Sequence, residues 1–265
     1  MRRRILSLGT LLLLLTAWRI PAATLYVDGG STNPAPPYLD WASAAADIQS
    51  AIDAAQDGDL ILVTNGLYAT GGRVIHGALT NRVAVDKAVT VQSVNGPDVT
   101  LIQGYQAPGY FPNDDTAIRG VYLTNHAALV GFTITGGATR YQGHGDIIQE
   151  QCGGGIWCES TNAAISNCVI TANTCMYYAA GVYSGTLYSS LVVSNLNRKT
   201  SYGGGAVAYS RVFDSVISGN LLGPNSDVGG GGGAFSCTLS NCVLTGNALT
   251  AVDHCFLDNC TLTNN

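Results

Sequence analysis

The chain contains 265 residues, of which 46% are hydrophobic, 11% are charged and 33 are glycine. This composition supplies enough apolar surface for a buried core and excludes a disordered chain, while the length allows one large domain or two small ones. The formal net charge of −5, with Lys and Arg scattered singly, argues against nucleic acid as a partner.

The N-terminus has the pattern of an export signal. Arg2, Arg3 and Arg4 precede an apolar run over residues 5–18, which is shorter than the ~20 residues of a bilayer-spanning helix. We expect a signal peptide over residues 1–23, with a buried or anchoring helix as the alternative. Cleavage leaves 8 basic and 17 acidic residues, a formal charge of −9, and no transmembrane segment in the mature chain.

Residues 24–57 are expected to form an N-terminal strand and a helix. Within WASAAADIQSAIDAAQDGD, which begins at Trp41, four apolar residues recur at helical spacing. They are Ala45, Ile48, Ile52 and Ala55. Because the end of a stack of repeats needs a cover, we expect this helix to cap the stack that follows.

Short strands are predicted through the remainder of the chain, residues 58–265. In its first half, apolar or alternating runs end at Gly or Asn. These runs cover residues 60–63, 89–91, 99–102, 121–123 and 129–134.

The second half of the chain contains an internal repeat. Segments such as ISNCVITAN (165–173) and LSNCVLTGN (239–247) align on a final asparagine, with spacings of 22, 25, 27 and 18 residues. The aligned residues are Asn173, Asn195, Asn220, Asn247 and Asn265. Repeats of this length cannot bury their own apolar face and must stack on their neighbours.

Each repeat has the alternation of a β-strand. Cys168 and Ile170 share one face, whereas Val169 and Thr171 point the other way. A second short strand opens each unit, as in GGGIWC at 153–158. Two or three strands per turn, joined by Gly and Asn corners, predict an all-β fold: a single-stranded right-handed parallel β-helix. We expect the repeated Asn to take the left-handed backbone conformation and to bond through its amide to the copies above and below.

The eight cysteines all lie between Cys152 and Cys260. Their columns hold small residues in other units, which predicts free, buried thiols at Cys237, Cys242, Cys255 and Cys260. A disulfide between stacked turns is the first alternative, since the strand spacing of ~4.8 Å suits a bridge. A metal site is disfavoured because the same columns hold no ligands elsewhere, and none is predicted.

Two long insertions form the candidate catalytic site. VTLIQG ends at Gly104 and FTITGG ends at Gly137, and each is followed by a long loop. Loops that leave the same edge of neighbouring turns can meet, and binding residues collect on such loops. The acidic and basic residues concerned are Asp114, Asp115, Arg119, Arg140, His144, Asp146 and Glu150. The alternative is that these are ordinary polar surface loops.

A column of large side chains is the candidate binding surface. Trp157, Tyr183, Val207 and Phe235 align in the GGGIWC strand and point away from Ile156. If this column faces solvent, it suits stacking on sugar rings or on a partner surface. If it does not, it is an internal aromatic ladder that stabilises the solenoid.

The opening TLYVDGG, the segment IQSAIDAAQDGDLILVTNGLY and the repeated GGGI and SNC-x-I-x-x-N signatures resemble pectate-lyase-like right-handed parallel β-helix proteins. More narrowly, they are similar to secreted bacterial β-helix proteins and polymorphic outer-membrane protein repeats. The resemblance implies the fold but not one activity, because this fold hosts lyases, hydrolases and adhesins. The chain stops at Asn265 within a repeat, which leads us to expect a C-terminal truncation.

Two functions remain open. The first is a secreted or cell-envelope scaffold, extracellular or outer-membrane associated, that binds polysaccharide or another cell-surface glycan without catalysis, as an adhesin does. The second is a polysaccharide lyase or glycoside hydrolase acting on acidic polysaccharide through the two-loop cluster. No cofactor is expected for the scaffold, whereas a lyase would call for Ca²⁺ held by carboxylates.

Overall fold

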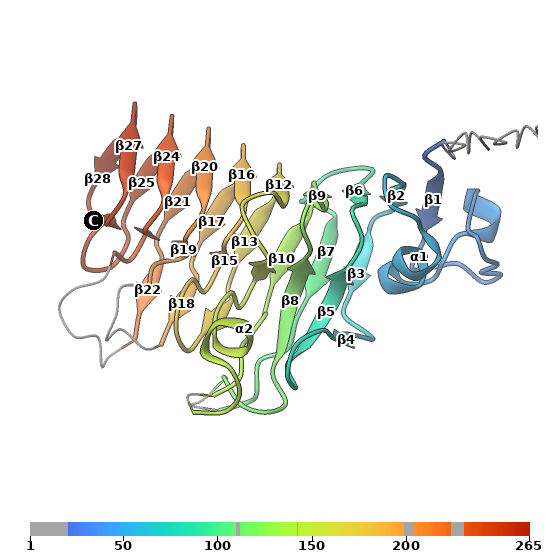
Figure 1. The fold of residues 1–265 in the computed structure, drawn as a ribbon, viewed down its shortest axis with the longest axis horizontal. Coiled ribbons are helices and arrows are strands. Elements are labelled where there is room, and N and C mark those ends of the chain that lie inside the picture. Colours follow the sequence, from blue (N-terminus) through green and yellow to red (C-terminus); the bar gives the residue numbers. More distant parts are fainter. Residues whose placement is uncertain (1–20, 110–111, 142, 199–203, 224–230) are drawn as a thin grey trace, which may run out of the picture.

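The computed structural model describes residues 21–109, 112–141, 143–198, 204–223 and 231–265. The chain forms an all-β, right-handed parallel β-helix whose turns stack along the long axis of the molecule (Figure 1). This confirms the predicted fold class.

Three long sheets make the walls of the coil, and we call them sheets A, B and C. Sheet A contains β1 (Thr24–Val27), β2 (Leu60–Val63), β6 (Thr90–Ser93), β9 (Ala128–Val130), β12 (Ala164–Ser166), β16 (Thr186–Tyr188), β20 (Arg211–Phe213), β24 (Thr238–Ser240) and β27 (Phe256–Asp258). Sheet B contains β3 (Gly66–Tyr68), β7 (Thr100–Gln103), β10 (Thr133–Thr135), β13 (Val169–Thr171), β17 (Leu191–Val193), β21 (Val216–Ser218), β25 (Val243–Thr245) and β28 (Thr261–Thr263).

Sheet C contains β5 (Thr80–Val85), β8 (Ile118–Leu123), β11 (Ile156–Cys158), β15 (Val182–Tyr183), β19 (Val207–Ala208), β23 (Ala234–Phe235) and β26 (Val252–Asp253), with β4 (Arg73–Val74) antiparallel at its edge. A fourth, short sheet consists of β14 (Thr174–Cys175), β18 (Leu196–Asn197) and β22 (Leu221–Leu222). Each complete turn therefore runs from sheet C to sheet A and then to sheet B.

The core is built from matching positions of successive turns. In sheet A the central residues Ile165, Leu187, Val212 and Leu239 pair in register, and all four are fully buried. Their strand neighbours point outward, as the alternation of a strand requires. Each turn thus buries its apolar side chains mainly against the turns above and below it.

The predicted asparagine column is confirmed as a ladder, which is buried from Asn173 to Asn247. The side-chain amide of Asn173 donates to Oδ1 of Asn195 at 3.0 Å, and Asn195 donates in the same way to Asn220 at 3.0 Å. The ladder continues through Asn247 to Asn265, at 2.9 and 2.8 Å. Each side-chain amide also donates to a main-chain carbonyl of the preceding turn, so the turn's polar backbone stays satisfied inside the protein.

The left-handed backbone conformation occurs at other corner residues than we expected. The ladder asparagines do not adopt it; the residue before each of them does, as at Ala172 (φ 55°), Ser194 (φ 56°) and Gly219 (φ 58°). A positive φ turns the chain sharply, which leaves the following Asn free to point its side chain inward. A second corner column, which includes Asn167 and Asp214, is also left-handed.

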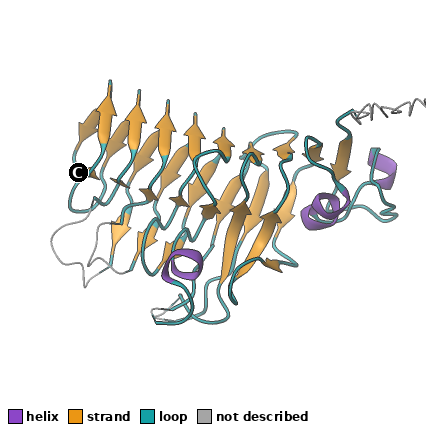
Figure 2. Cartoon of the chain, in the orientation of Figure 1, coloured by secondary structure: helices purple, strands orange, loops and turns teal. Residues whose placement is uncertain are grey.

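The N-terminal helix is present but shorter than the pattern suggested. The α-helix α1 spans Ile48–Ala54 and is preceded by a 3-10 turn at Trp41–Ser43 (Figure 2). The helix begins after Asp47, because the Asp47 carboxylate accepts from the Ser50 amide as an N-cap. Ala45 therefore precedes the helix and pairs with Val27 in an isolated bridge. The helix packs on strands β1, β2 and β5, and its role as a cap stays a prediction.

One predicted run in the first half proved to be two strands. Residues 129–134 divide between β9 of sheet A and β10 of sheet B, because Gly131 adopts a φ of 79° and turns the chain between them. The export signal falls on residues 1–20, outside the described residues, apart from its last three positions, and stays a prediction. Within the described ranges, no helix combines the length and apolar character needed to cross a membrane.

All eight cysteines are described, and all are free thiols. Cys237 and Cys242 are buried, as predicted, whereas Cys255 and Cys260 in the last turn are half-buried. The backbone N–H of Cys237 donates to Sγ of Cys255 at 3.3 Å. The described residues contain no cluster of three or more His, Cys, Asp or Glu residues that could hold a metal ion.

Candidate functional site

The two long insertions leave the coil at the same place. Ile102 pairs with Ile134 and Gln103 with Thr135 in sheet B, so the loops after β7 and β10 start from adjacent turns. The second loop contains the short helix α2 (Ile147–Gln151), which the sequence did not predict. The ion pair of Asp115 in the first loop with Arg140 in the second confirms that the two loops meet.

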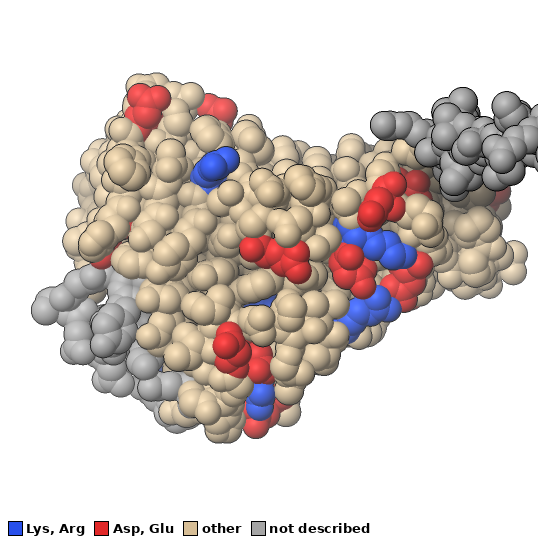
Figure 3. All heavy atoms as spheres, viewed as in Figure 1, with Lys and Arg blue, Asp and Glu red and all other residues tan. Residues whose placement is uncertain are grey.

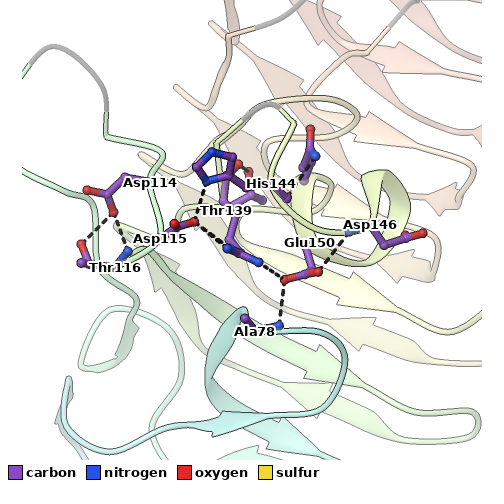
Figure 4. Close-up of polar contacts among 10 residues, drawn as sticks. Ala78, Asp114, Asp115, Thr116, Thr139, His144, Asp146 and Glu150 are labelled. Atoms are coloured by element: carbon purple, nitrogen blue, oxygen red, sulfur yellow. Dashed lines mark hydrogen bonds and ion pairs between the residues drawn. The ribbon is translucent and has the colours of Figure 1, made fainter.

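Four of the predicted residues form one ion cluster, which we call the loop cluster: Asp115, Arg140, His144 and Glu150 (Figure 4). The guanidinium of Arg140 binds Asp115 at 2.7 Å on one side and Glu150 at 2.8 Å on the other. His144 Nδ1 lies 2.9 Å from the same Asp115 oxygen. Arg140 thus ties a carboxylate of the first loop to a carboxylate of the second.

Glu150 is the buried anchor of the loop cluster, with only 4% of its side chain exposed. Its carboxylate accepts from the amides of Ala78 at 2.8 Å and Asp146 at 3.0 Å. Burial raises the pKa of Glu150, but the hydrogen bonds from Arg140 and these two amides outweigh burial and hold the pKa below its ordinary value. A carboxylate with a lowered pKa and no free oxygen is poorly suited to act as a general acid.

Two glycines make room for this anchor. A Cβ at Gly77 would lie 2.1 Å from Glu150 Oε1, and a Cβ at Gly145 would lie 2.0 Å from the same atom. Both glycines also adopt positive φ angles, of 58° and 71°. Gly77, between β4 and β5, and Gly145, in the second loop, therefore pack tightly around Glu150, which indicates a structural contact rather than an open cleft.

The two remaining carboxylates of the loops, Asp114 and Asp146, stay outside the cluster. Asp114 turns toward its own loop and accepts from the amide and hydroxyl of Thr116, both at 2.7 Å. Asp146 caps α2 by accepting from the amides of Ile148 and Gln149 at 2.9 and 2.8 Å. Local backbone hydrogen bonds therefore account for both residues.

Arg119 lies beneath the loops and not among them. It is 2% exposed and donates to the carbonyls of Gly153, Gln149 and Cys152 and to Oδ1 of Asn81. Burial lowers the pKa of Arg119 to about 10. Its role in this position is to bind the carbonyl groups at the end of α2.

The residues of the loop cluster do not fit a Ca²⁺ ion. Calcium takes six to eight oxygen ligands, whereas Arg140 already occupies the place between the two carboxylates. The oxygens of Glu150 accept from three N–H groups. What the loop cluster offers to solvent is the pair His144 and Asp115, each about half exposed, at 50% and 54%.

The aromatic column of sheet C is mostly covered. Tyr122 and Trp157 stack at 5.6 Å with an interplanar angle of 11°, and Trp157 and Tyr183 stack at 6.1 Å with the same angle. Trp157 is only 6% exposed, and its indole N–H donates to the Ile148 carbonyl of α2. The ladder thus forms part of the protein's own packing, and binding by Trp157 would require α2 to move.

The membership of this column needs one correction. Tyr183 pairs with Ala208, and Ala208 pairs with Phe235. Val207 instead pairs with Val182 on the inward side and is fully buried. The ring of Tyr178, which lies 5.6 Å from Phe235 and stacks on it, covers Phe235. Tyr183 and Phe235 are half-buried, and ligand binding by either stays a prediction.

A second aromatic pair, which the sequence interpretation missed, lies on the outer face of sheet A. Tyr188 and Phe213 occupy paired positions of β16 and β20, and their rings stack at 5.3 Å with an angle of 14°. Tyr188 is 43% exposed. Each ring stands seven residues before its ladder asparagine, Asn195 or Asn220, so the repeat alignment contained the signal.

Small residues leave the outer sides of this pair open. Ser166 precedes Tyr188 in the column, and Ser240 follows Phe213. Beyond Phe213 lies a shallow cavity of about 310 Å³ lined by Thr238, Ser240, Phe256 and Asp258 among others. We call this surface, Tyr188, Phe213, Thr238, Ser240, Phe256 and Asp258, the sheet A patch. It combines ring faces with hydroxyl groups and one carboxylate.

In Figure 3, charged side chains gather around α1 and β4 and around the loops of α2, and a few more lie over the upper strands at the C-terminal end of the coil. The first group includes the ion pairs of Arg73 with Asp53 at 2.6 Å and with Asp86 at 3.2 Å. The second is the loop cluster, and these pairings satisfy the charges internally.

No model of a known protein family matches this chain, and no curated protein matches it. Among solved structures, it is similar to the pectate lyase Pel9A, with 15% identity, a TM-score of 0.49, and 85% of this chain and 64% of that one covered. A rhamnogalacturonan lyase is 12% identical, with a TM-score of 0.44 and coverages of 92% and 63%. Rice weevil pectin methyl esterase is 8% identical, with a TM-score of 0.41 and coverages of 94% and 92%. The chain spans slightly less than two thirds of each of the two lyases.

Proposed function

We propose that this chain is an exported, non-catalytic β-helix that binds polysaccharide through the sheet A patch. The observation that carries the proposal is the stacked pair Tyr188 and Phe213 on an open sheet face. Aromatic ring faces bury the apolar C–H surface of a sugar, and nearby hydroxyl and carboxylate groups bind its hydroxyls. The last strands of sheet A present both kinds of group side by side.

The geometry of the patch supports a chain-like ligand. Strands of one sheet follow one another about every 4.8 Å, and Tyr188, Phe213, Ser240 and Asp258 continue in one column. Ser240 Oγ donates to Asp258 Oδ2 at 3.2 Å, which leaves the other carboxylate oxygen to accept from a ligand. A polymer lying along the axis of the coil would meet a ring pair and then polar groups.

The first test is a depletion assay of the full chain on a panel of soluble and insoluble polysaccharides. We expect saturable binding to at least one polymer, weakened about tenfold or more in Tyr188→Ala and Phe213→Ala. The matched control is Trp41→Ala, because Trp41 is also 44% exposed but lies at the N-terminal end. Equal loss in all three variants, or no binding to any polymer, would refute the proposal.

The alternative function is cleavage of an acidic polysaccharide at the loop cluster, with catalytic roles for the predicted residues Asp114, Asp115, Arg140, His144, Asp146 and Glu150. The exposed pair of His144 and Asp115 is the observation in its favour, since a carboxylate can orient a histidine base. A screen for new unsaturated or reducing ends, with and without Ca²⁺, separates the two functions. Product formation that disappears in His144→Gln would favour the enzyme.

A further inference from the structure

A cavity near the N-terminal end of the coil contains a buried cation without an acidic partner. The cavity measures about 260 Å³ and lies between the start of α1, the strand β3 and the strand β5. Its lining includes Arg82 of β5, and this arginine is only 7% exposed. Among the described residues, no carboxylate forms an ion pair with Arg82. A guanidinium that is largely removed from water and has no carboxylate beside it can gain from an anionic ligand.

The guanidinium of Arg82 is fixed but only partly used. Its Nε donates to the carbonyl of Gln103 at 2.7 Å, and its Nη1 donates to the carbonyl of Gly71. A guanidinium has five N–H donors, so the Nη1 and Nη2 edge retains unused ones. The described part of the chain leaves no buried side-chain nitrogen or oxygen without a partner, so the unpaired Nη2 is accessible to solvent. Burial lowers the pKa of Arg82, and no neighbouring acid opposes this effect.

The remaining lining defines the size and chemistry of a ligand. Asp47 is the single acidic residue in the lining, and it is engaged in capping α1 through Ser50 at 2.8 and 2.7 Å. Thr70 offers its hydroxyl, and Leu67 and Tyr68 offer apolar surface. The volume lies below the range of about 300–1,000 Å³ for drug-sized ligands, which points to a small molecule.

We propose that this cavity binds a small organic carboxylate, whose two oxygens accept from the Nη1 and Nη2 edge of Arg82. The planar edge of a guanidinium matches a carboxylate in a two-bond arrangement. A hydroxyl next to the carboxylate would meet Thr70. This site lies several turns from the sheet A patch, so its ligand need not be the polysaccharide.

The test is a titration of the isotope-labelled full chain with sodium lactate, followed by nuclear magnetic resonance, with sodium chloride as the ionic-strength control. We expect saturable shifts of the Arg82 Nε–H resonance and of the Thr70 and Gly71 amides, with a Kd on the order of 1 mM. Absence of a saturable shift at Arg82 would overturn the proposal. Tighter binding of inorganic phosphate than of lactate would also overturn the assignment to carboxylates.

Variants make the assignment specific. Arg82→Gln should weaken lactate binding about tenfold or more, whereas Arg211→Gln, a change at an exposed arginine of sheet A, should leave it unchanged. Leu67→Trp provides a second variant that keeps every hydrogen bond of Arg82, because Leu67 is 60% exposed and lines the cavity. We expect it to obstruct the cavity and weaken binding as well. Unchanged affinity in both Arg82→Gln and Leu67→Trp would refute the proposal.

Discussion

At the scale of single residues, the asparagine ladder shows how a polar side chain stabilises the interior of a solenoid. Asn220 donates to the Val192 carbonyl and to Asn247, and its Oδ1 accepts from both the backbone and the side-chain amide of Asn195. Asn220 is fully buried. Removing the amide would leave several buried partners unsatisfied, which costs more than the loss of the bonds themselves.

We therefore expect Asn220→Ala to lower the free energy of unfolding by about 2–4 kcal/mol, measured by urea denaturation. Asn162→Ala is the control, because Asn162 is exposed on a turn. The control should change stability by less than about 0.5 kcal/mol. Similar free energies of unfolding for both variants would show that the ladder does not stabilise the fold by this amount.

Cysteine reactivity is the second residue-scale prediction. A hydrogen bond with the Cys237 thiol and the Cys237 backbone N–H lower the pKa of Cys255, and Cys255 is half-buried. Burial raises the pKa of Cys158 and Cys168. In the folded protein near neutral pH, we expect iodoacetamide to label Cys255 first, because the thiolate is the reactive form. Peptide mass spectrometry after timed labelling checks this; faster labelling of Cys158 would contradict it.

At the scale of elements, the loop cluster holds the two insertions together. Arg140 joins Asp115 to Glu150, and Glu150 also binds the backbone at Ala78. Hydrogen bonds from His144 and Arg140 hold the pKa of Asp115 below its ordinary value, and the pKa of Glu150 is lowered as well. Acids with a lowered pKa stabilise the fold above their unfolded pKa, and this stabilisation is lost as the pH falls through their folded pKa.

We expect Arg140→Gln to lower the free energy of unfolding at pH 7 by about 1–3 kcal/mol. The wild-type protein should lose stability on acidification below the ordinary glutamate pKa of 4.5, and the variant should lose less over the same interval. Urea denaturation between pH 3 and pH 7 measures both effects. The control Arg211→Gln should keep the wild-type pH dependence, and an unchanged dependence in Arg140→Gln would contradict the assignment.

The sequence predicted the coil itself because each strand repeats its pattern in register. The column of Cys168, Ser190 and Ser215 and the ladder of asparagines were visible as vertical matches, since one physical environment recurs at each turn. The aromatic column was misaligned at Val207 because the glycine triplet at 203–205 begins one residue early. In the structure Val207, and not Ala206, pairs with Val182 inside the core.

The candidate site was harder to predict because its loops do not repeat. Their meeting followed from the equivalent ends of β7 and β10, but the partner of each carboxylate did not. Asp114 and Asp146 instead accept from nearby backbone amides, and such local hydrogen bonds compete with a tertiary ion pair. Arg119 is buried where it binds the carbonyls of Gln149 and Cys152 at the end of α2, and no pattern in the sequence predicted this helix.

At the scale of the whole molecule, stability comes from stacking and hydrogen bonds and not from cross-links. All eight cysteines are free, so we expect the midpoint temperature of unfolding to be the same with and without dithiothreitol. Differential scanning calorimetry of protein purified from an oxidising compartment checks this. A clear drop in that temperature on reduction would reveal a disulfide between stacked turns, such as Cys237 with Cys255.

The ladder also sets a rule for how the molecule can change in length. Its asparagines lie 22, 25, 27 and 18 residues apart along the chain, yet each makes the same pair of contacts with the next. Excision of residues 221–247 would make Asn265 the new neighbour of Asn220. The hydrogen bonds that Asn220 makes to Asn247 would then be made to Asn265 instead. Whole turns are therefore interchangeable units, and gene duplication or loss of one unit can lengthen or shorten this rod without redesigning its interior.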